Sequence, residues 1–120
     1  MQIPLYFPTQ LPPHFAYDKT SLTSDPQNQT VFYSFKNASG KSINVNIQLK
    51  PKDYDIDAFY TRILSNIQGT ATPYGDAKIG MMGHATVGIL DTGKAWVIVK
   101  YNDTDFASML ANLMSSLKQY

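Results

Sequence analysis

The sequence predicts an α+β domain, with one antiparallel sheet of about five or six strands and two helices packed on one face of that sheet. The expected order is β-β-β-α-β-β-β-α. Residues 42–49 alternate between apolar and polar side chains, residues 94–101 form a strongly β-prone run, and residues 106–117 carry apolar side chains at helical spacing. The length of 120 residues corresponds to one domain.

Residues 1–13 hold four of the seven prolines and predict an extended arm, because prolines at this density exclude a helix. Large apolar side chains between the prolines indicate that the arm packs on the domain formed by residues 14–120 rather than lying free in solvent. These side chains are Ile3, Leu5, Tyr6, Phe7 and Leu11.

The first half of the domain is expected to contain three strands. The first covers residues 14–18 and is followed by a polar connection at 21–29. The second and third, at 30–36 and 42–49, form a hairpin around residues 37–40. Alternation in the third strand predicts one buried and one polar face. The apolar face holds Ile43, Val45, Ile47 and Leu49, and the polar face holds Ser42, Asn44, Asn46 and Gln48.

Asp55 is the expected N-cap of a first helix, whose apolar stripe runs to Ile67 and which Gly69 ends. A connection at 70–74 precedes three further strands and a closing helix. The strands are expected at residues 77–81, 84–90 and 94–101. The apolar positions of the closing helix are Phe106, Met109, Leu110, Leu113, Met114 and Leu117.

The composition excludes several functional classes. The chain has no cysteine, so disulfides, thiolate nucleophiles and iron–sulfur clusters are absent. The net charge is +1 and Arg62 is the single arginine, which is not the charge pattern of a nucleic-acid-binding surface. No apolar run reaches the roughly 18–20 residues that span a bilayer. We expect no cofactor and no metal. The expected partner is an unknown protein or a small apolar ligand, with membrane contact only through a segment outside this sequence.

The patterns that would indicate catalysis or metal binding are weak. His14 and His84 are the only histidines, and their spacing matches no zinc motif. The aspartates within residues 53–57 are typical of a helix N-terminus, where carboxylates interact favourably with the helix dipole. The alternative to a non-catalytic domain is a small hydrolase or ligand-modifying enzyme that uses His84 with Asp76 or Asp91.

Aromatic side chains are numerous, with eight Tyr, six Phe and one Trp. Residues 94–101 are apolar on both faces, so both faces of this strand should be covered. We expect the helix layer on one side and the proline arm, a ligand cleft or a partner on the other. The residues predicted to line a binding surface are Tyr6, Phe7, Tyr33, Trp96 and Tyr101.

Three motifs occur in an order that resembles a known family. They are the stretch from Leu5 to Phe15 with its Leu11-Pro12 pair, the Gly93-to-Trp96 segment, and Ser116-Leu117. The chain is similar to a domain-of-unknown-function family found as the extracytoplasmic part of bacterial anti-sigma-factor-like and other membrane-anchored proteins. That family usually has Gly-Tyr or Gly-Phe after Leu-Pro, where this chain has Pro13.

The resemblance implies a non-catalytic extracytoplasmic binding or interaction domain, at the cell surface and tethered by a segment outside this sequence. It brings no catalytic residues. A structural module of a cell-surface assembly is a further alternative.

Overall fold

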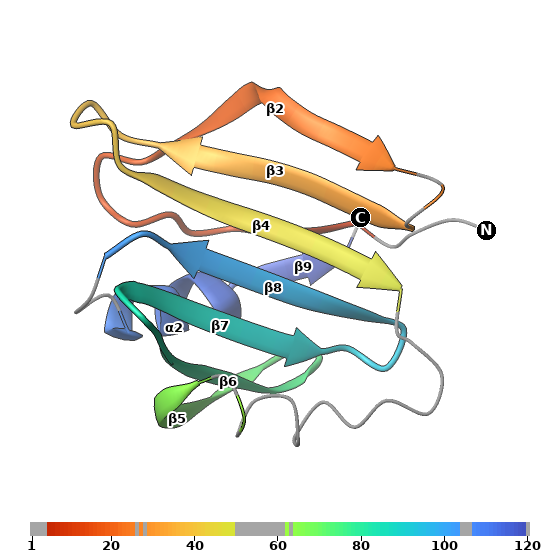
Figure 1. Cartoon of the computed structure of the whole chain (residues 1–120). Coiled ribbons are helices and arrows are strands. Elements are labelled where there is room, and N and C mark those ends of the chain that lie inside the picture. Colours follow the sequence, from red (N-terminus) through yellow and green to blue (C-terminus); the bar gives the residue numbers. More distant parts are fainter. Residues whose placement is uncertain are drawn as a thin grey trace.

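The computed structural model describes residues 5–25, 27, 29–49, 62, 64–103 and 107–119. The elements in chain order are β1 (Tyr6–Pro8), β2 (Ala16–Asp25), β3 (Thr30–Lys36), β4 (Ser42–Leu49), β5 (Ser65–Thr72), β6 (Gly75–Met82), β7 (Ala85–Asp91), β8 (Ala95–Tyr101), α2 (Ala107–Ser115) and β9 (Leu117–Gln119). Seven of the strands form an antiparallel sheet in the order β2-β3-β4-β8-β7-β6-β5, and β1 pairs with β9 in a second sheet. The helix α2 and β9 lie behind the large sheet in Figure 1.

The fold is mostly β, and the predicted sheet of five or six strands with two helices is wrong. The described residues form nine strands in two sheets, and α2 is the one helix whose bounds lie among them. Two predicted connections are strands: β2 continues through the polar stretch to Asp25, and residues 70–74 belong to the β5–β6 hairpin. Both stretches lie in the outermost strands of the sheet and bury little apolar surface, so they lack the alternation that identifies a strand.

The predicted first helix falls mostly on residues 50–61 and 63, which lie outside the described residues. Its predicted end is wrong, because Ile67 and Gly69 belong to the edge strand β5. Ile67 is 37% exposed, so its place in an apparent helical stripe does not reflect burial.

The closing helix is confirmed as α2 over Ala107–Ser115, and its buried side chains are Leu110, Leu113 and Met114. Leu117 begins β9 instead of continuing the helix. The residues that were expected to form the last helical turn therefore pair with the arm.

The predicted strands at 30–36 and 42–49 are confirmed as β3 and β4, and their register defines two faces of the sheet. Val45 lies between Tyr33 of β3 and Val99 of β8, and all three side chains are 0% exposed. They belong to the same core cluster as Leu110 and Leu113 of the helix. We call this side of the sheet the α2 face.

Gly88 of β7 lets α2 approach the sheet closely. A Cβ atom at this position would collide with Sδ of the buried Met114, and it would lie 3.3 Å from a methyl carbon of Leu110. The missing side chain therefore provides the space that the helix occupies.

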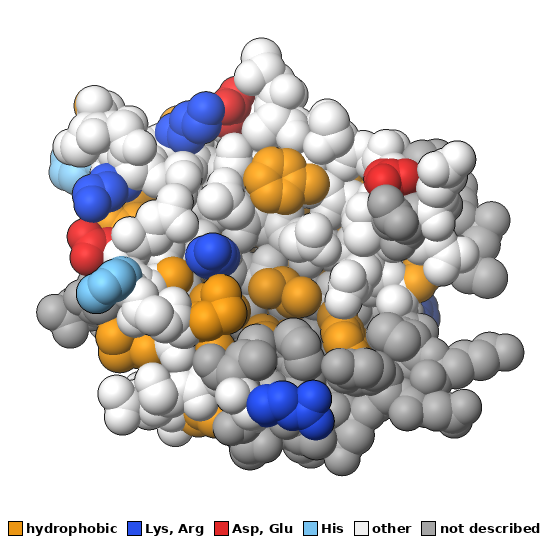
Figure 2. All heavy atoms as spheres, in the orientation of Figure 1, with side chains coloured by type: hydrophobic (Ala, Val, Ile, Leu, Met, Phe, Trp, Pro, Cys, Tyr) orange, Lys and Arg blue, Asp and Glu red, His pale blue; other side chains and the backbone are white. Residues whose placement is uncertain are grey.

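The opposite face of the sheet has a smaller apolar cluster. Val87 and Ile89 of β7 are buried there together with Leu64 and Ala85. Figure 2 shows this face, on which isolated hydrophobic and charged side chains lie among polar and backbone atoms.

The proline arm lies on the α2 face. Tyr6 pairs with Gln119, so the β1 and β9 segments are tied side by side. The Phe7 ring stacks on the Tyr33 ring at a centroid distance of 4.3 Å. The Tyr33 hydroxyl donates a hydrogen bond to the Tyr6 carbonyl, and the Tyr6 hydroxyl donates to Oγ1 of Thr92 at 2.9 Å. The arm was one of three covers expected for the face of the sheet opposite the helix layer. It lies instead on the same face as α2.

Burial under the arm raises the pKa of Tyr33 above its ordinary value of 10.0, and the nearby Tyr17 raises it further. The folded protein thus holds this proton more tightly than the unfolded chain. The resulting stabilisation is complete below pH 10 and is lost as the pH rises from there towards the folded-state pKa.

We expect Tyr33 to reduce the free energy of unfolding by up to about 1.4 kcal/mol per pH unit above pH 10. Chemical denaturation between pH 8 and pH 11 would measure this slope. Tyr33→Phe should be less stable at pH 8, because it loses one hydrogen bond, but its stability should fall less steeply above pH 10. Equal slopes for the two proteins would contradict the prediction.

Candidate functional site

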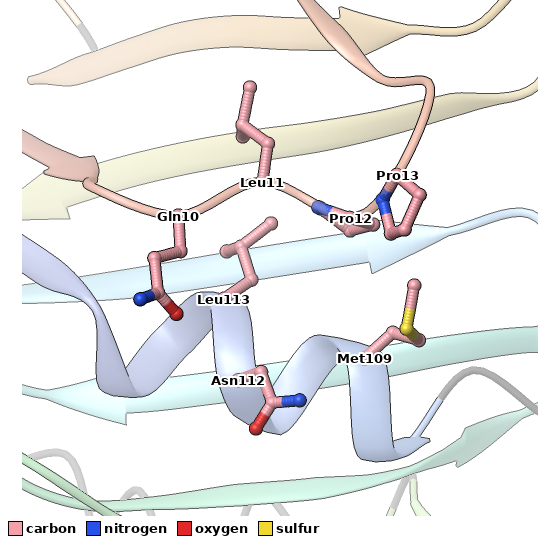
Figure 3. A pocket seen from close by; sticks show the side chains of 7 residues that line it. All are labelled: Gln10, Leu11, Pro12, Pro13, Met109, Asn112 and Leu113. Atoms are coloured by element: carbon pink, nitrogen blue, oxygen red, sulfur yellow. The ribbon is translucent and has the colours of Figure 1, made fainter.

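A pocket of about 130 Å³ opens between the proline arm and α2 (Figure 3). The arm forms one wall and the helix forms the other. The lining residues are Gln10, Leu11, Pro12 and Pro13 from the arm, and Met109, Asn112 and Leu113 from α2.

Hydrogen bonds at Ser116 hold one end of this pocket closed. The backbone N–H and the hydroxyl of Thr9 both donate to the Ser116 carbonyl at 3.0 Å, and the N–H of Gln10 donates to Ser116 Oγ at 3.1 Å. Pro12 and Pro13 follow, and they have no N–H with which to continue the attachment. The Ser116 hydroxyl also lies 3.4 Å from the Gln10 carbonyl, to which it donates. Among the described residues the arm makes no backbone hydrogen bond to α2 itself, and the pocket lies where the attachment at Ser116 stops.

The pocket has apolar walls and amide groups at its rim. Of the two leucines in the lining, Leu113 is 1% exposed and Leu11 is 36% exposed. In Figure 3 Met109 and Leu113 point from the helix towards the arm, and Gln10 points from the arm towards the helix. None of the seven lining side chains is ionisable. The lining therefore offers no general acid, general base or activated nucleophile.

The residues predicted to line a binding surface lie elsewhere, and most of them are buried. Tyr6, Tyr33 and Trp96 are at most 3% exposed, Tyr101 is 9% exposed, and Phe7 is half-buried. The structure brings Tyr6, Phe7 and Tyr33 together beneath the arm. Tyr101 shares the α2 face with them, whereas Trp96 projects from the opposite face. In this arrangement they contribute to the core, and their role in binding stays a prediction.

The alternative enzyme requires His84 beside an aspartate, and the structure does not bring these groups together. His84 lies in the exposed turn between β6 and β7. Asp91 ends β7 and Asp76 lies near the start of β6. Six or seven residues of strand separate each aspartate from the turn, which corresponds to roughly 20 Å.

Metal binding finds no support in the described part of the chain, where no three His, Asp, Glu or Cys side chains form a group that could hold an ion. The aspartates of residues 53–57 lie outside the described residues. Within the same part of the chain, no helix has both the length and the apolar character needed to cross a bilayer.

Comparison with known proteins finds no matching family model, no matching curated protein and no matching solved structure. The similarity to the extracytoplasmic domain family therefore stays a prediction that rests on the three motifs in the sequence.

Proposed function

We propose that this chain is a non-catalytic binding domain that holds a small apolar group in the pocket between the proline arm and α2. The observation that carries the proposal is the composition of the lining, with five apolar residues, two amides and no ionisable side chain. Ligand sites commonly combine apolar walls with a few polar groups that orient the ligand.

The volume of the pocket limits the size of its ligand. An apolar cavity of about 150 Å³ holds one benzene molecule, and this pocket is slightly smaller at about 130 Å³. A single aromatic ring fits this size. The amides of Gln10 and Asn112 would accept or donate a hydrogen bond to one polar substituent on that ring.

We also propose, on the motif resemblance, that the domain works outside the cytoplasmic membrane and is tethered by a segment outside this sequence. Fractionation of cells that express the natural gene would test this location. A product found only in the cytosol would contradict it.

Methionine methyl NMR with p-cresol as the probe would test the pocket. Met109 lines it, while Met82 lies on β6 and is not among the lining residues. We expect millimolar p-cresol to shift the Met109 methyl signal and to leave the Met82 signal in place. A dissociation constant of about 1 mM, equivalent to ~4 kcal/mol, is a reasonable expectation for so small a ligand.

Two matched substitutions separate pocket binding from general effects. Gln10→Trp places a bulky ring at the pocket and should abolish the shift. Gln27→Trp introduces the same side chain at an exposed position in the turn between β2 and β3, and it should leave the shift intact. An unchanged Met109 signal at saturating p-cresol, or equal shifts at all methionines, would refute the proposal.

A further inference from the structure

We infer that the face of the sheet opposite α2 carries a second binding site, which takes a neutral polysaccharide. Its centre is the polar side of β4, formed by Asn44, Asn46 and Gln48, which we call the amide row. This site is separate from the pocket, and the inference does not depend on the function proposed above.

The amide row presents side chains only, because the β4 backbone is paired on both sides. β3 pairs with one edge of the strand and β8 with the other. Successive members of the row are two residues apart, so they project from the same face at intervals of roughly 6.8 Å. An extended peptide binds at the edge of a sheet through backbone hydrogen bonds, which a central strand cannot offer. The row therefore suits a ligand that hydrogen-bonds to side chains at regular intervals.

The hydrogen-bonding capacity of the row is unused within the described part of the structure. None of the three amide groups has a hydrogen-bond partner there, and Oδ1 of Asn46 is buried without one. Each amide can donate two hydrogen bonds and accept at least one. A buried polar atom without a partner costs stability. The amide atoms of Asn44 and Gln48 and the amide nitrogen of Asn46 are not buried in this way, so ligand hydroxyl groups, which both donate and accept, can reach them.

Apolar side chains flank the centre of the row. Phe32 of β3 and Ile98 of β8 lie on either side of Asn46 in the strand register, and both are half-buried. An aromatic ring offers an apolar surface beside polar groups. The C–H face of a sugar ring can rest on such a surface while its hydroxyl groups reach the amides.

The charges around the row favour a neutral polymer. Lys100 flanks Asn44, and no described carboxylate forms an ion pair with it. At the other end, Trp96 of β8 lies beside Gln48 in the strand register, and Asp91 of β7 lies beside Trp96. The described charges near the row are one cation, Lys100, and one anion, Asp91, so the row carries no excess of either sign and an uncharged polyhydroxylated chain is the better match.

Native gel electrophoresis in gels that contain hydroxyethylcellulose or dextran would test the inference. We expect at least one of these neutral polysaccharides to retard the protein. The double variant Asn44→Ala/Gln48→Ala should weaken binding by about 3- to 10-fold for each amide removed. The matched control Gln27→Ala/Gln68→Ala removes two exposed amides outside both sites and should bind as the unmodified chain does.

Asn46→Leu separates a binding role from a structural one. It replaces the unpartnered amide with an apolar group of similar shape, so the melting temperature should rise while polysaccharide binding falls. A purely structural role would not move these two readouts in opposite directions.

Three results would overturn the inference. The first is no retardation by either neutral polysaccharide, and the second is equal retardation of the amide-row and control variants. The third is retardation by alginate alone that disappears in 0.5 M NaCl, which would indicate ionic attraction. The p-cresol shift of Met109 should be the same in all these variants, so failure here leaves the pocket proposal unaffected.

Discussion

Val45→Asp is expected to lower the free energy of unfolding by several kcal/mol, an amount comparable with the total stability of a domain of this size. The Val45 side chain is 0% exposed and lies in register between Tyr33 and Val99, both also buried. An aspartate there would be removed from water with only apolar side chains and a hydroxyl-bearing ring as its neighbours in register. The carboxylate would have to be protonated, or the domain would have to unfold.

Asn44→Asp is the matched control, because it introduces the same side chain one residue away on the opposite face. That position is half-buried and lies beside Lys100. We expect a change within about 0.5 kcal/mol. Urea denaturation of both variants measures the difference, and equal midpoints would show that the assignment of side chains to faces in β4 is wrong.

The double variant Tyr6→Ala/Phe7→Ala should have the second-largest effect. Replacing one buried aromatic side chain by alanine typically costs about 3–5 kcal/mol. The Phe7 ring stacks on Tyr33 and contacts Tyr17 at a centroid distance of 5.0 Å, and the Tyr6 ring contacts Tyr74 at 5.1 Å. Their effects should add incompletely, because neighbouring residues in one cluster share their losses.

Guanidinium denaturation would measure the loss, with Leu22→Ala as the control. Leu22 is a large apolar residue of β2 but is 48% exposed, so its replacement should have little effect. A loss of less than 1 kcal/mol in the double variant would mean that the arm is only loosely held. The pH dependence attributed to Tyr33 should also weaken in this variant, since the ring would regain contact with water.

Strands with one buried face could be predicted from the sequence, because successive side chains of a strand point to opposite faces and therefore alternate between apolar and polar. β4 is the clearest case: Ile43, Val45 and Ile47 are buried, and the residues between them form the polar side. β8 was predicted to be apolar on both faces, and it has buried side chains on both, with Trp96 on one side and Val97 and Val99 on the other. The polar composition of the amide row was likewise visible in the sequence, although its lack of hydrogen-bond partners was not.

Edge strands and the site between arm and helix could not be predicted in this way. β5 has mostly exposed side chains, so no periodicity marks it, and the sequence offered a helix ending there instead. The residues that line the pocket were assigned to the proline arm and to the closing helix. No local sequence pattern predicts that the arm and the helix contact each other. Thr9 and Ser116, which join them, are 107 positions apart.

The sequence alone determined which residues form the central strands and the closing helix, because side-chain periodicity is a local property of a strand or a helix. Only the tertiary structure decided that β1 pairs with β9, that the arm shares a face with α2, and that Tyr33 is covered. These outcomes depend on contacts between distant segments, whose energies come from the buried surface and hydrogen bonds formed when the segments meet.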